Sequence, residues 1–209
     1  EDERVEVRLA CLDALAVVGD QTSIAPLREH EEENAVARTE RRRALVLLEE
    51  RYPEERAGIA WDEVTAVVAV GALVDASESG EDLSPELRRF LLRHLRMQPG
   101  LAVVDSPEEL ERIDARLWWH RLRPLLVTGR LHTLNASRMG DELIWQAAGS
   151  VTVLDYRDRT IRAVLDNRAL VHTAAGRGTG PSGSAPTSRA VEEAMRSAAE
   201  SLSSRLDEI

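Results

Sequence analysis

The segment "RPLLVTGRLHTLN", residues 123–135, places Gly129 beside Thr128 in an apolar run. Many phosphate-binding loops use such a pair, but they lead into a helix whose N-terminal amides hold the anion. Here the apolar pattern continues through Leu131 and Leu134, so no helix begins. We therefore predict a strand that crosses the core, in which Gly129 relieves crowding by neighbouring backbone.

The residues before this strand alternate between strand and helix patterns. "VTAVVAVGALVDAS" (64–77) is rich in valine and lacks polar alternation until Asp75, which is typical of a strand buried on both faces. A Ser-Pro-Glu start at Ser84 predicts a helix that ends near Gly100. "LAVVD" (101–105) predicts a short strand, and Ser106 begins a further helix with a capping box.

The residues after it predict a meander and a final helix. "LIWQAAGSVTVLDY" (143–156) reads as a strand, and "TIRAVLD" and "ALVHTAA" as shorter strand segments around Asn167. An alanine-rich helix follows, from about Arg189 to Glu208. The expected fold class is mixed α/β or α+β, with the order β-α-β-α-β-β-β-α over residues 59–209.

Residues 1–58 have the 3.6-residue period of helices. Val5, Leu9, Leu12 and Ala16 form one apolar stripe, and Leu15, Val18 and Cys11 lie on a second flank that we expect to be covered as well. "VRLACLDALAVVGD" (7–20) and "SIAPLREH" (23–30) resemble one HEAT repeat, and "NAVARTERRRALVLLEER" (34–51) resembles the first helix of the next. Such repeats need stacked neighbours to bury their faces.

Composition excludes several classes of function. The net charge of −10 opposes general binding to nucleic acid or anionic lipid. All 27 basic residues are arginine, which removes the lysine of a P-loop or a Schiff base. The single Cys11 excludes an internal disulfide and is expected to be a small buried hydrophobe. No apolar run is long enough to cross a bilayer.

The succession of strands also carries a family resemblance. "VVAVGALVDAS", "GLAVVD", "LLVTGRLHTL", "GSVTVLDYRD" and "ALVHTAAGRG", followed by the alanine-rich helix, resemble the periplasmic α/β domain of the TolB amino-terminal domain, CsgG and LpoB-type activators. The resemblance covers residues 62–209. It implies a non-catalytic envelope module that binds or assembles with other proteins, and homo-oligomerisation is one form of such assembly.

Two departures limit what this resemblance implies. The connection "NASRMGDE" is too short for hairpins that enter a membrane, so pore formation is not expected. The lipid-bearing cysteine of such lipoproteins is absent, and Cys11 lies inside a helix. We expect a periplasmic or outer-membrane-associated protein whose signal or anchor lies upstream of Glu1, with a cytoplasmic location as the alternative.

No catalytic, cofactor-binding or metal-ligating residue is predicted. The five histidines are scattered and form no metal-binding motif. The acidic residues from Asp75 to Asp82 fit a solvated loop better than a ligand pocket. The glycine-rich segment 176–188 reads as a linker, and its ordering on a partner is a hypothesis.

"ARLWWHRLRP" is the best candidate for a partner surface. Adjacent helical residues point about 100° apart, so Trp118 and Trp119 cannot both face one core. Either one lies in the core with the other half covered, or the pair forms a partner surface of the Trp and Arg composition seen in interface hot spots. The predicted partner-binding residues are Trp118, Trp119, Arg121, Arg88 and Arg93.

The function predicted from these patterns is a non-catalytic protein-binding or scaffolding module of the bacterial envelope. Its partner is expected to be an envelope protein. A cytoplasmic regulatory adaptor that senses a small ligand through the α/β domain is the alternative. An enzyme of unfamiliar type is a further possibility, although no positioned nucleophile, base or cofactor loop is visible.

Overall fold

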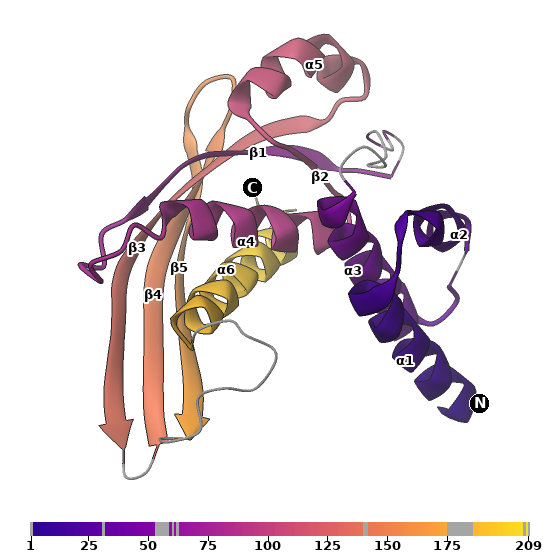
Figure 1. The fold of residues 1–209 in the computed structure, drawn as a ribbon. Coiled ribbons are helices and arrows are strands. Elements are labelled where there is room, and N and C mark those ends of the chain that lie inside the picture. The colour runs from indigo at the N-terminus through magenta and orange to yellow at the C-terminus, as the bar shows by residue number, and fades with distance from the viewer. Residues whose placement is uncertain are drawn as a thin grey trace. The chain divides into compact units, whose positions relative to one another are not determined.

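The computed structural model describes residues 2–30, 32–52, 59, 61, 63–139, 142–174, 186–206 and 208. The chain divides into two compact units, Glu1–Ile59 and Ala60–Ile209 (Figure 1). Each unit has a hydrophobic core of its own. None of the helices in the described ranges is both long and apolar enough to cross a membrane.

The first unit is helical, with α1 (Asp2–Val18), a 3-10 turn (Gln21–Ser23), α2 (Ile24–Glu29) and α3 (Ala35–Arg51). Helix α3 begins where Asn34 accepts hydrogen bonds from the amides of Val36 and Ala37. The core comprises Leu12, Ala16, Ile24, Leu27, Ala37, Ala44 and Leu48. Of the predicted second flank of α1, Leu15 is partly buried against this core, but Cys11 and Val18 are exposed, because α3 packs on the side of α1 that carries Leu12 and Ala16.

The second unit is built on one mixed sheet. Its strands, as the structure describes them, are β1 (Ala66–Asp75), β2 (Leu101–Val104), β3 (Arg123–Met139), β4 (Glu142–Asp155) and β5 (Ile161–Ala174). Their order across the sheet is β2-β1-β3-β4-β5. Strand β1 pairs in parallel with β2 and β3, and the other pairs are antiparallel. The predicted mixed fold class is confirmed.

Helices lie on both faces of this sheet (Figure 1). Helices α4 (Ser84–Met97) and α6 (Pro186–Ser204) pack together on one face, where most of the core lies. Helix α5 (Pro107–Trp119) covers the parallel strands on the other face. Right-handed crossovers cause this split. The connection from β1 to β2, which contains α4, and the connection from β2 to β3, which contains α5, run in opposite directions across the sheet, so the two helices lie on opposite faces.

Two strands are longer than the sequence pattern predicts. Strand β3 continues through Ser137 to Met139, inside the segment "NASRMGDE" that the sequence predicts to be a short connection. Strand β5 runs unbroken through Asn167 instead of forming two short segments. Asn167 is buried, donates to the Leu165 carbonyl at 3.0 Å and lies 3.5 Å from the Ser197 hydroxyl on α6. The polar residue that looked like a break is therefore accommodated inside the core.

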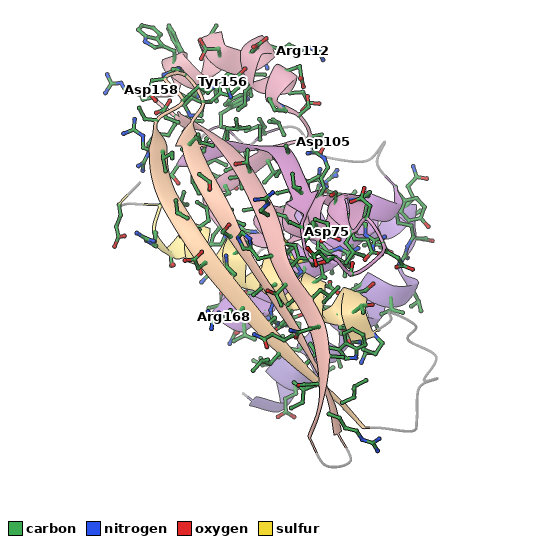
Figure 2. All side chains as sticks on the ribbon, turned by 90° about the vertical axis from the view of Figure 1, so that its left-hand side faces the viewer. Asp75, Asp105, Arg112, Tyr156, Asp158 and Arg168 are labelled. Carbon is green, nitrogen blue, oxygen red and sulfur yellow. The ribbon has the colours of Figure 1, made fainter. Side chains whose placement is uncertain are left out.

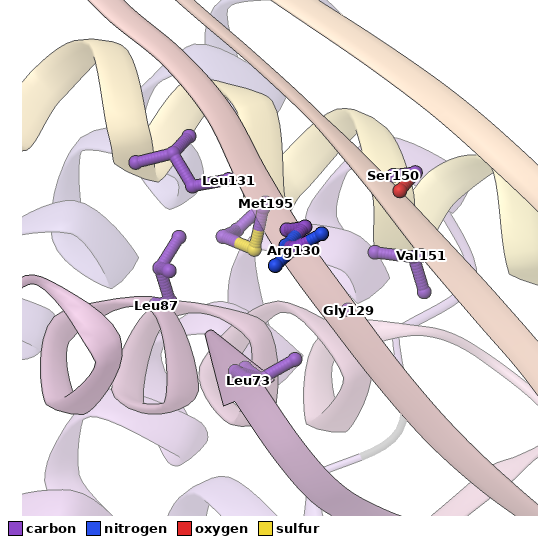
Figure 3. Close-up of a pocket in the computed structure, with 8 residues that line it drawn as sticks. All are labelled: Leu73, Leu87, Gly129, Arg130, Leu131, Ser150, Val151 and Met195. Atoms are coloured by element: carbon purple, nitrogen blue, oxygen red, sulfur yellow. The ribbon is translucent and has the colours of Figure 1, made fainter. Parts of the chain in front are cut away.

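Gly129 lies in β3, as the core-strand prediction requires. A Cβ at this position would come within 3.0 Å of a Leu73 methyl group and of the Ser150 carbonyl oxygen. The adjoining gap, lined by Leu87 and Met195 among others, has no room for a water molecule (Figure 3). Gly129 therefore permits close packing of strands and does not open a ligand site.

Candidate partner-binding surface at the end of helix α5

Helix α5 buries one narrow stripe and leaves its two tryptophans in solvent. Leu110 and Leu117, seven residues apart, are fully buried against the sheet. Trp118 is 71% exposed and Trp119 is 78% exposed. The interpretation that one of them lies in the core is therefore wrong, because Leu117 takes the inward position at this level of the helix.

The turn that ends α5 fixes where the tryptophans point. The Leu122 amide donates to the Leu117 carbonyl at 2.9 Å, and the Arg121 amide donates to the Trp118 carbonyl at 3.1 Å. Arg121 has φ +55°, so these bonds form a Schellman motif with an arginine at the position that glycine usually takes. We call Trp118, Trp119, His120 and Arg121 the α5 tip.

Aromatic stacking also holds the α5 tip. The Trp61 ring, just before β1, stacks on His120 with a centroid distance of 5.2 Å and an interplanar angle of 20°. Trp61 itself is only partly exposed. This stack fixes the helix end to the start of the parallel strands, so the Trp118 and Trp119 backbone is anchored while their rings remain free.

The turn between β4 and β5 anchors the middle of α5. The Tyr156 hydroxyl donates to Glu111 Oε1 at 2.9 Å, and Arg157 donates two hydrogen bonds to Asp114 Oδ1. Burial and the Glu111 carboxylate raise the pKa of Tyr156. Figure 2 shows Tyr156 and Asp158 at the end of the molecule where α5 lies. The exposed face of α5 thus carries charges of both signs.

The structure does not bring all predicted partner-binding residues together. Trp118, Trp119 and Arg121 form the α5 tip, whereas Arg88 and Arg93 lie on α4, across the sheet. Arg88 donates to the carbonyls of Val70 at 2.7 Å, Gly71 at 2.9 Å and Asp105.

Arg93 also makes contacts inside the fold. Its guanidinium lies 3.3 Å from Glu192 Oε1 on α6 and 5.8 Å from the centre of the Phe90 ring. Arg88 and Arg93 therefore hold α4 to the sheet and to α6, whereas Trp118 and Trp119 at the α5 tip are exposed to solvent.

The residues considered for a metal or ligand site do not form one in the described part of the chain. No group of His, Cys, Asp and Glu side chains there could hold a metal ion. Asp75 accepts from the amides of Ser77 and Leu83, which closes the acidic loop on itself. Of the glycine-rich segment, residues 176–185 lie outside the described part, and residues 186–188 begin α6.

One contact was not visible in the sequence. The Nε2 atom of His132 lies 2.8 Å from the Ser150 hydroxyl, because β3 and β4 bring residues 18 positions apart together. This resembles a base and nucleophile pair. Ser150 lies in β4, which pairs with strands on both sides, so its neighbouring amides serve the sheet and are not free to stabilise an oxyanion. The pair alone does not make a hydrolase site.

No family model matches the chain, and no curated protein matches it. Several solved structures align with it at low identity. The PelC dodecamer from Paraburkholderia phytofirmans is 11% identical, with a TM-score of 0.41 over 70% of this chain and 91% of that chain. A Xanthomonas campestris protein of family-model DUF330 is 10% identical, with a TM-score of 0.43 over 69% and 90%.

A minor lipoprotein from Acinetobacter baumannii is 11% identical, with a TM-score of 0.35 over 68% of this chain and 91% of that chain. No family follows from similarities of this size. The functional argument therefore depends on the geometry of the chain itself.

Proposed function

We propose that this chain is a non-catalytic protein-binding module of the bacterial cell envelope, and that the α5 tip is its contact with a protein partner. The observation that carries the proposal is the exposure of Trp118 and Trp119 on an anchored helix end. Large aromatic rings on a rigid backbone lose little conformational entropy on binding and dominate interface energies. Arg121 beside them supplies a polar contact.

The charges around the α5 tip favour a protein over a lipid surface. The helix carries the acidic residues Glu108, Glu109, Glu111 and Asp114 as well as Arg112 and Arg116, and the whole chain has a net charge of −10. Anionic lipid would be repelled by this balance. A protein surface of mixed charge would not.

The envelope location rests on the resemblance of residues 62–209 to the periplasmic α/β domain described above. Residues 1–58 are proposed to be a HEAT-like segment, and residues 59–209 the α/β domain. In this arrangement the helical segment adds a second surface for assembly, and the α5 tip belongs to the α/β domain.

The test compares the full chain with Trp118→Ala and Trp119→Ala variants in pull-downs from envelope and cytosolic fractions. The affinity of each retained protein is then measured by calorimetry. We expect at least one substitution to weaken binding of an envelope protein by about 30-fold, the loss typical of an interface hot spot. Val74→Ala is the control, because Val74 is an apolar residue of β1 that is 44% exposed and belongs to neither α5 nor β5.

Three outcomes would contradict the proposal. Retention of the same proteins by all variants would remove the α5 tip as the contact. Retention of cytosolic proteins alone would favour the regulatory adaptor. Sedimentation with vesicles of phosphatidylethanolamine and phosphatidylglycerol, lost in the tryptophan variants, would make the tip a membrane contact.

A further inference from the structure

Strand β5 forms one edge of the sheet. It is 14 residues long and, in the part of the chain that the structure describes, pairs with β4 alone. An edge strand presents a row of unpaired backbone donors and acceptors that can pair with another strand. Proteins usually shorten or bend such edges. In β5 the register shift lies near the start of the strand, between the pairs Val153–Ala163 and Leu154–Ile161, and the strand pairs regularly with β4 from Ala163 to Ala174.

The side chains of β5 are arranged symmetrically about Asn167. On the exposed face, Asp166 and Arg168 flank this residue, and Val164 and Leu170 lie next outward. On the buried face, Leu165 and Ala169 flank it. An antiparallel pair of β5 strands centred on Asn167 would therefore place Asp166 opposite Arg168 of the second copy, and Val164 opposite Leu170 of the second copy. Two-fold symmetry repeats each pair.

The residues that would meet are unengaged in the single chain. Within the described residues, neither the Asp166 nor the Arg168 side chain has a hydrogen bond or an ion pair. Val164 is 53% exposed and Leu170 is 59% exposed. Figure 2, which looks onto this face, shows Arg168 on β5. Opposite charges and apolar side chains directly across a strand pair both stabilise it.

We propose that two copies of this chain form a two-fold symmetric dimer by antiparallel pairing of β5 with β5, centred on Asn167. Charges on an edge strand usually prevent pairing with other strands. Here Asp166 and Arg168 have opposite signs, so the register centred on Asn167 is complementary to itself, whereas the adjacent registers, centred on Asp166 or on Arg168, place like charges opposite each other. The dimer joins the two sheets into one and leaves the α5 tip to its own partner.

Charge reversal tests the register. Asp166→Arg places arginine opposite Arg168 at both symmetric positions, and we expect the dimer dissociation constant from analytical ultracentrifugation to rise about tenfold or more. The double variant Asp166→Arg with Arg168→Asp restores opposite charges and should restore dimerisation. Glu81→Arg is the matched control, because Glu81 is exposed in a loop between β1 and α4.

Disulfide trapping gives a second readout. In a Cys11→Ser background, Val164→Cys and Leu170→Cys proteins are oxidised separately and as a mixture. In the proposed register only the mixture is cross-linked, because equivalent Val164 positions lie about 20 Å apart along the strand. A wild-type chain that stays monomeric up to about 1 mM would overturn the proposal. So would a dimer that is insensitive to Asp166→Arg, or cross-linking of one variant with itself.

Discussion

Arg121 adopts a backbone conformation that glycine adopts at lower cost. Its φ of +55° brings the arginine Cβ close to the backbone, a strain that glycine avoids. The residue nevertheless ends α5 in an ordinary way, with both hydrogen bonds of the Schellman motif formed. This conformation places an arginine side chain beside the two exposed tryptophans.

We expect Arg121→Gly to stabilise the chain by up to about 1 kcal/mol, because it relieves the left-handed conformation. Urea unfolding followed by circular dichroism measures the change. Arg112→Gly, in the interior of the same helix, should instead destabilise by about 1 kcal/mol. Equal effects of the two variants would show that the C-terminal turn carries no strain. If the α5 tip binds a partner through this arginine, Arg121→Gly should also weaken that binding.

Glu192 on α6 links the two helices that cover the core. The His94 ring and the Arg93 guanidinium lower its pKa below the ordinary value of 4.5. His94 Nε2 lies 3.6 Å from Glu192 Oε1, which is longer than a hydrogen bond, so the ring acts through its N–H dipole or charge.

A depressed carboxyl pKa contributes stability that is present above the unfolded-state pKa and lost as the pH falls through the folded-state pKa. We therefore expect Glu192→Gln to be less stable than the wild type near about pH 7, with a difference that shrinks below about pH 4.5. Urea unfolding at a series of pH values tests this. Glu200→Gln, at an exposed ion pair, should show a small difference throughout.

At the scale of elements, the short β2 explains the role of Arg88. Strand β2 ends at Val104, opposite Ala69, and the pairing of β1 with β3 shifts register between Val70 and Leu73, so the carbonyls of Val70 and Gly71 both face Arg88 instead of alternating between neighbouring strands. The Arg88 guanidinium supplies their donors and also binds the Asp105 carbonyl beyond β2. A side chain thus completes the edge of β1 where the neighbouring strand stops.

We expect Arg88→Met to destabilise the chain by about 2 to 4 kcal/mol, because it leaves partly buried carbonyls without donors. Arg89→Met is the control. The Arg89 side chain is 57% exposed and 3.9 Å from Glu86, so its loss should cost less than about 1 kcal/mol. Similar losses for both variants, measured by chemical unfolding, would contradict this role of Arg88.

The elements of the second unit were predictable because each carries its own periodicity. The amphipathic pattern of α4 and the valine-rich run of β1 depend on neighbouring residues only. The continuity of β5 was not predictable, because Asn167 is stabilised by Leu165 and by Ser197, which lies 30 residues further on. The role of Arg88 was not predictable for the same reason: the carbonyls that accept its hydrogen bonds lie 17 and 18 residues away in the chain.

At the scale of the whole molecule, the two units bury separate sets of apolar residues. The core of the sheet draws on residues between Ala66 and Leu206, and that of the helical unit on residues between Leu12 and Leu48. The core of the sheet unit includes residues of α4 and α6. The helical core is small, and α1 keeps Val7, Cys11 and Val18 in solvent.

We expect residues 60–209 alone to unfold in one cooperative transition and to keep the slow amide exchange of β1, β3 and β4, because all strand partners are present. Residues 1–59 alone should be only marginally stable, since about 60 residues bury too little surface. Hydrogen exchange measured by NMR on each fragment and on the full chain tests this. Rapid exchange throughout the 60–209 fragment would contradict it.

The sequence alone determined the class of fold, the order of elements and the absence of a P-loop or an internal disulfide, because these follow from local periodicity and from which residue types are present. Tertiary structure alone decided that both tryptophans are exposed, that Arg88 belongs to the sheet, and that β5 is one unbroken edge strand. Those facts depend on contacts between residues far apart in the chain, and periodicity along one segment carries no information about what packs against it.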